Sequence, residues 1–83
     1  MATAYMKKVV VAAEYAAIEA ARTVVNCEIS CPPANVGNVT FKVGGSEVEW
    51  IAGEYHSFRE LDLSSIQVKG TPGDVITVIG EAD

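Results

Sequence analysis

The chain has 83 residues and a mass of 8.8 kDa, the size of one small domain. Hydrophobic residues make up 49% of it, but 11 alanines and 12 valines supply more than half of these, so we expect a thin core that gains stability from partners or further copies. The net charge of −5, with eight acidic residues in 43–83, argues against nucleic acid or an anionic membrane as a partner.

Residues 1–22 form the first predicted segment, an N-terminal arm with a short alanine-rich stretch. Lys7–Val11 favours a strand, whereas Ala12–Arg22 consists of good helix formers. We predict a short helix over residues 12–22, with an extended arm as the alternative. The apolar run after Lys8 is too short for a signal peptide, so we expect the chain to be made in the cytoplasm.

Residues 23–83 are predicted to form a small antiparallel β-sandwich or barrel. Apolar and polar residues alternate in Arg22–Cys31, Asn38–Val43, Glu47–Ile51 and Ile66–Lys69, and Val75–Ile79 is apolar on both sides. Turn residues separate these stretches about every ten residues, at Pro32–Asn38, Gly44–Ser46, Ala52–Glu54, Lys69–Asp74 and Gly80. Such spacing is typical of an all-β fold.

The residues that carry chemistry are few. Cys27 and Cys31 would lie roughly 13 Å apart on one face of a strand, too far for a disulfide, so we expect buried thiols. His56 and Ser57 are neighbours in sequence, and on a strand their side chains would face opposite ways. We therefore predict no enzymatic activity, no cofactor and no metal site.

Two groups of residues are candidates for contact with a partner protein. Tyr5, Met6, Lys7 and Lys8 form the basic spot near the start of the chain. The largest cluster of aromatic residues in the sequence consists of Trp50, Tyr55 and Phe58. We interpret it first as part of the core and second as an aromatic edge that anchors a partner.

Residues 23–80 resemble small structural proteins of tailed bacteriophages. The resemblance rests on an alternating strand, an Asn-x-Gly loop and an apolar strand in Ile29–Phe41, the turn Ala52–Glu54, the segment Leu61–Gly70 and the closing hairpin Thr71–Gly80. The alanine-rich stretch 12–22 departs from the extended start usual in that family.

The resemblance implies a virion component, most simply a capsid decoration or cement protein on the capsid surface that bridges the major capsid protein or other virion proteins. We expect a homo-oligomer, with a trimer at capsid three-fold positions as the simplest form. The alternative is a tail or head-fibre binding module that recognises a protein or glycan partner. Open strand edges could join adjacent copies in either case.

Overall fold

The computed structural model describes residues 2–82, which fold into eight β-strands without a helix. The strands are β1 (Thr3–Val10), β2 (Ala16–Ala17), β3 (Val24–Ser30), β4 (Val39–Val43), β5 (Ser46–Trp50), β6 (Tyr55–Asp62), β7 (Ile66–Gly70) and β8 (Val75–Ala82). The all-β fold predicted from alternation and turn spacing is confirmed.

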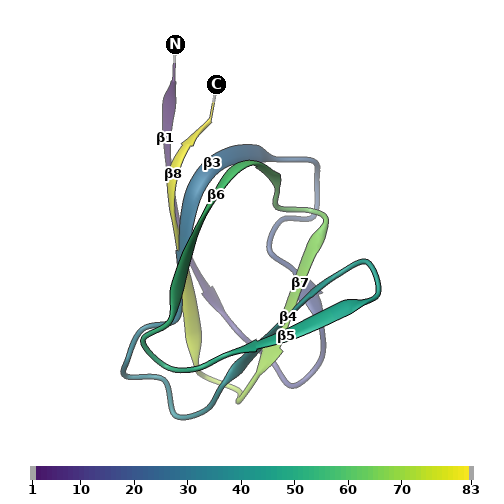
Figure 1. Cartoon of the computed structure of the whole chain (residues 1–83), viewed down its shortest axis with the longest axis vertical. Helices are drawn as coiled ribbons and strands as arrows, with labels where there is room; N and C mark the ends of the chain where they lie inside the picture. The colour runs from purple at the N-terminus through teal and green to yellow at the C-terminus, as the bar shows by residue number, and fades with distance from the viewer. Residues whose placement is uncertain (1, 83) are drawn as a thin grey trace.

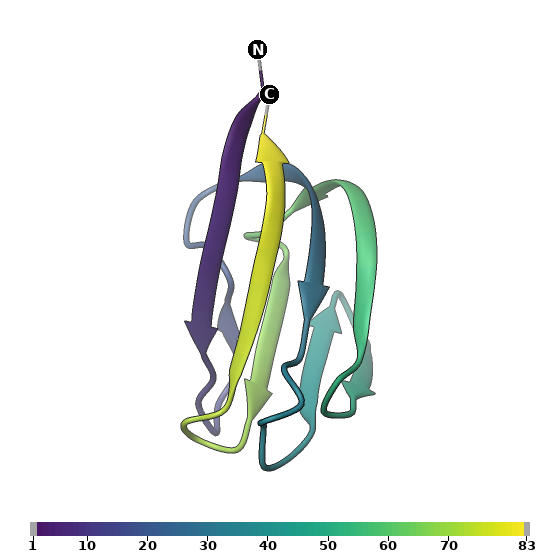
Figure 2. The ribbon, with the colours of Figure 1, turned by 90° about the vertical axis from the view of Figure 1, so that its left-hand side faces the viewer.

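The strands form two antiparallel four-stranded sheets that face one another. Sheet A has the order β1-β8-β3-β6 and sheet B the order β2-β7-β4-β5. This is the arrangement of a double-sheet jelly roll. Figure 2 shows sheet A in front, with β1 beside β8 and both chain ends at one end of the molecule. Each sheet keeps two edge strands, β1 and β6 in sheet A and β2 and β5 in sheet B.

The core lies between the sheets and is built from alternate side chains of the central strands. On β3, Val25, Cys27 and Ile29 are buried while the residues between them face solvent. Ile76 and Val78 on β8 are fully buried in the same layer. Cys27 and Cys31 are free and buried, as the sequence predicts.

The helix predicted over residues 12–22 is wrong. This segment is extended and bent, and only Ala16–Ala17 pairs, with Gln67 and Val68 of β7. Its alanines bury little surface in any conformation, so Ile18 decides the path: its side chain enters the core and its backbone N–H bonds to the carbonyl of Ile66. Tertiary burial outweighs the helix propensity of the alanines here.

The start of the chain belongs to the sandwich. β1 pairs with β8 along its whole length, from Thr3 opposite Ala82 to Val10 opposite Val75, and Val11 and Ile18 are core residues. The arm expected over residues 1–22 therefore shares one core with residues 23–83 within the part of the chain that the structure describes. Met1 and Asp83, at the ends of these ranges, lie outside the described residues.

Candidate functional site

A groove of about 400 Å³ opens between the edge strands β5 of sheet B and β6 of sheet A. We call this side of the molecule, strands Ser46–Trp50 and Tyr55–Asp62 with the groove, the open side. Most of the lining is apolar, and it comprises Phe41, Val43, Ser46, Val48, Trp50, His56, Ser57, Phe58 and Ile66. The groove lies where the two sheets fail to cover one another.

Two valines show that the sandwich is incomplete at this corner. Val48 pairs with the buried Phe41, and Val43 with the buried Ile66, so both valines lie on the inward face of sheet B. They are nevertheless 56% and 49% exposed. Figure 1 shows why: the β4–β5 hairpin reaches away from sheet A, so no strand of that sheet covers its end.

Aromatic rings form the floor of the groove. Trp50 stacks on Phe41 with ring centroids 3.9 Å apart, and Phe58 lies nearly parallel to the indole at 6.3 Å. Trp50 is only 5% exposed. The first interpretation of Trp50, as a core residue, therefore holds, and the residue also borders the groove.

His56 contributes a polar rim to the groove. Its Nε2 lies 2.7 Å from Oε2 of Glu54, and its ring meets Trp50 edge-on at 4.7 Å. The His56 contact, with a hydrogen bond from the Ile51 N–H, holds the pKa of Glu54 below its usual value. Among the described residues, the hydrogen-bond partner of His56 is Glu54, and no hydroxyl or thiol bonds to its ring.

The opposite side of the sandwich is closed. We call it the closed side and define it as β1 with residues 11–19, which run from β1 through β2. Contacts of Glu19 and Ile18 hold residues 11–19 against β1. The Tyr5 hydroxyl donates a hydrogen bond to the Glu19 carboxylate, and Lys7 Nζ lies 3.1 Å from the same carboxylate. Lys7 also donates a hydrogen bond to the Ile18 carbonyl. The Tyr5 and Lys7 contacts lower the pKa of Glu19.

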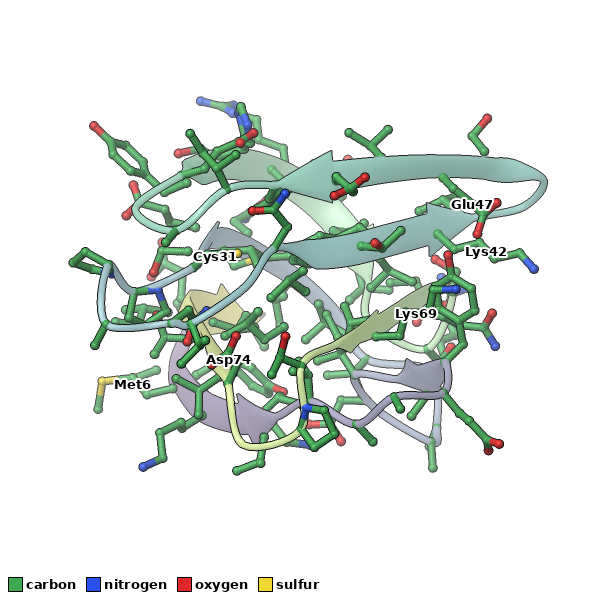
Figure 3. All side chains as sticks on the ribbon, turned by 90° about the horizontal axis from the view of Figure 1, so that it is seen from below. Met6, Cys31, Lys42, Glu47, Lys69 and Asp74 are labelled. Carbon is green, nitrogen blue, oxygen red and sulfur yellow. The ribbon has the colours of Figure 1, made fainter. Side chains whose placement is uncertain are left out.

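The predicted partner-contact residues separate into four places. On β1, the side chains of Tyr5 and Lys7 contact Glu19, whereas those of Met6 and Lys8 point outward from sheet A. Met6 is 75% exposed and projects from the ribbon in Figure 3. Trp50 and Phe58 line the groove. Tyr55, 62% exposed, lies on the edge strand β6. The fold does not gather these residues into one surface.

The outer face of sheet B carries a polar cluster that the sequence analysis missed. The Tyr15 ring lies under Lys69 Nζ at 4.6 Å and Lys42 Nζ at 5.2 Å, and its hydroxyl donates to Glu47. That hydrogen bond raises the pKa of Tyr15 to about 12. Figure 3 shows Lys42, Glu47 and Lys69 gathered at this face. Since the members lie up to 54 residues apart, only the sheet register could reveal them.

Residues 2–82 contain no group of three or more His, Cys, Asp or Glu side chains placed to hold a metal ion. The same residues include no helix of the length and apolar character needed to cross a membrane. The features that remain as candidates for function are the groove and the unpaired strand edges.

The comparisons with known proteins support the fold. No protein-family model matches the chain, and no curated protein matches it at a significant level. One similar solved structure is from Bacillus endospore appendages, described as a novel family of disulfide-linked pili, with 18% identity and a TM-score of 0.59 over 100% of this chain and 88% of that one. Another is a de novo designed double-stranded β-helix, with 18% identity and a TM-score of 0.50 over 96% and 99%.

Proposed function

We propose that the chain is a non-enzymatic structural subunit that joins other protein subunits through its open side. The observation that carries this proposal is the apolar groove between β5 and β6, two edge strands with no strand of residues 2–82 paired on their outer side. Half-exposed valines beside unpaired backbone are the features of a surface completed by another protein.

The chemistry of the site supports a binding role. The His56–Glu54 pair faces a tryptophan rather than a nucleophile. Burial raises the pKa of both thiols, that of Cys31 to about 11 with a contribution from Glu54, so they are poor nucleophiles and metal ligands at neutral pH.

The kind of assembly is the finer part of the proposal. The resemblance of residues 23–80 to phage structural proteins favours a capsid decoration or cement protein that binds the major capsid protein, most simply as a trimer. The likeness in fold to an endospore appendage protein described as a pilus supports a role in an extended fibre. In this chain such a fibre would lack disulfides between folded copies, because Cys27 and Cys31 are buried.

Purified particles and surface fibres from cells that produce the chain test this proposal. We expect mass spectrometry to find the chain there in many copies, and labelled electron microscopy to place it on a shell or along a fibre. A chain confined to the soluble fraction, as a monomer with catalytic turnover, would contradict the structural role. Location on a tail or head fibre would instead favour the alternative binding module.

A further inference from the structure

We propose that the groove on the open side is filled by the closed side of a second copy of this chain, placed beside the first in the same orientation. This inference rests on the proposed structural role and names the partner for that surface. It follows from the directions of the edge strands, from the side chains exposed on both sides, and from the difference between the two sides.

Strand direction is the first argument. Each sheet has four strands, and every neighbouring pair is antiparallel, so β1 runs opposite to β6 and β2 opposite to β5. A copy translated sideways without rotation therefore places its β1 antiparallel to β6, and its β2 antiparallel to β5. Both sheets continue at once, and the antiparallel alternation is preserved.

Edge length gives the second argument. β1 and β6 are eight residues each, so they match in length along sheet A. β2 pairs over only two residues and β5 over five, so sheet B contributes less backbone pairing and more side-chain contact. The alanines within residues 12–17 have short side chains, so the backbone of this part of the closed side can come close to the groove of the next copy.

Side chains at the two edges of sheet A give the third argument. Tyr5 and Val9 on β1, and Phe58 and Leu61 on β6, pack against the core but are only partly buried. Pairing of β1 with β6 of the next copy would place these four side chains in one layer. The same contact would cover Val43 and Val48, which makes the cores of neighbouring copies continuous.

The two sides differ, so the contact is heterologous and every copy has one side of each kind. Such contacts form a ring where the rotation between copies closes and a filament where it does not. Copies placed in the same orientation extend into a filament, whereas a trimer, the smallest such ring, needs a rotation between neighbours that closes the ring.

Paired blocking substitutions test the inference. V48E places a charge in the groove, and A17E places one on the outer face of β2, next to Glu47 and Glu49 of the neighbouring β5. We expect the natural chain to form assemblies larger than a dimer in sedimentation velocity and native mass spectrometry. Each variant alone should remain monomeric at concentrations where the natural chain assembles, because its dissociation constant for a second copy rises at least about tenfold. A mixture of the two should give a one-to-one dimer, since each retains one intact side.

Control variants distinguish a blocked contact between copies from a general effect of an added charge. V36E changes an exposed valine in the loop before β4 and should assemble as the natural chain does. A17K matches A17E in position and should not weaken assembly. Should V48E fail to fold, S46E blocks the same inward edge of β5.

Three results would overturn the inference: a natural chain that stays monomeric at millimolar concentration, blocked variants that assemble normally, or a mixture that remains monomeric. A monomeric chain that still binds isolated particles, and loses that binding through V48E, would overturn the second-copy partner and leave the structural role standing.

Discussion

The carboxylate of Asp74 accepts a hydrogen bond from the backbone N–H of Gly37 at 2.8 Å, between loops 37 residues apart in sequence. Its other oxygen accepts from Val36 N–H at 2.9 Å. Asn35 and Val75 form two more hydrogen bonds: the Asn35 side-chain amide donates to the Val75 carbonyl, and its oxygen accepts from the Val75 N–H. These contacts hold the loop between β3 and β4 against the β7–β8 turn. Asp74 is the buried charged residue of the described chain.

Replacing Asp74 with alanine should destabilise the protein by about 2 kcal/mol, because two hydrogen bonds to a charged acceptor are lost. The loss is measured as the free energy of unfolding in urea. D74N keeps one acceptor oxygen and should lose less than D74A. Hydrogen exchange at Val36 and Gly37 should accelerate in D74A, and unchanged protection there would show that the carboxylate does not hold the loop.

Trp50 should behave as a core residue. W50A removes the ring that stacks on Phe41, and we expect a loss of about 3–5 kcal/mol in the free energy of unfolding. Y55A, on the exposed part of β6, is the matched aromatic control and should change stability by less than about 1 kcal/mol. A W50A protein that keeps its stability but loses a ligand would instead support the binding-module alternative.

The strands β3, β4, β5 and β7 were predicted correctly because apolar and polar residues alternate along them. β3 alternates Val25, Cys27 and Ile29 with polar residues because sheet B covers one side and solvent the other. β6 escaped prediction as a strand: it borders the groove, so its inward residue His56 is itself exposed and the alternation is lost. β5 also borders the groove, but its alternation of Val48 and Trp50 with glutamates could still be read from the sequence.

The groove itself could not be predicted, since its position depends on how far the β4–β5 hairpin extends past sheet A. Its aromatic members were visible as the cluster Trp50, Tyr55 and Phe58, but their register was not, and Tyr55 points away from the groove. Gly80 was interpreted as a turn residue and in fact lies within β8.

Gly80 is required by a close approach between strands. A Cβ atom at this position would collide with the Asn26 carbonyl oxygen and the Cys27 Cα of β3. We expect G80A to lower the free energy of unfolding by at least about 2 kcal/mol, since backbone must move to accept the methyl group. G45A is the matched control: its Cβ meets open space in the β4–β5 turn, and its effect should stay within about 0.5 kcal/mol. Equal effects of the two substitutions would contradict the packing of β8 on β3.

Acid should weaken the fold at Glu19 on the closed side and at Asp62 on β6. Hydrogen bonds from Tyr5 and Lys7 lower the pKa of Glu19 below its ordinary value of 4.5, and Ser64 and Thr23 lower that of Asp62. A carboxyl group whose pKa is lower in the folded state stabilises the protein above the unfolded-state pKa, and this stability is lost as pH falls through the folded-state pKa. Stability in urea should therefore decline below about pH 4.5.

The variant E19Q should show a shallower decline in that acidic range, because it no longer carries the carboxylate that Tyr5 and Lys7 stabilise. E14Q is the control, since Glu14 is an exposed glutamate on the same segment. Parallel pH profiles for E19Q and the natural chain would show that the Glu19 contacts contribute nothing to folding.

The thiols should remain unreactive while the protein is folded. Cys27 and Cys31 are buried, and burial raises the pKa of both. Little thiolate therefore exists at neutral pH, and a thiol reagent should label the native chain only as fast as it opens, but at once in denaturant. Any assembly of folded copies should accordingly keep the same mass with and without a reducing agent. The variant C27A/C31A should form the same assemblies at a cost in stability. Dissociation on reduction, with a covalent dimer on a non-reducing gel, would show that the thiols are accessible and link copies.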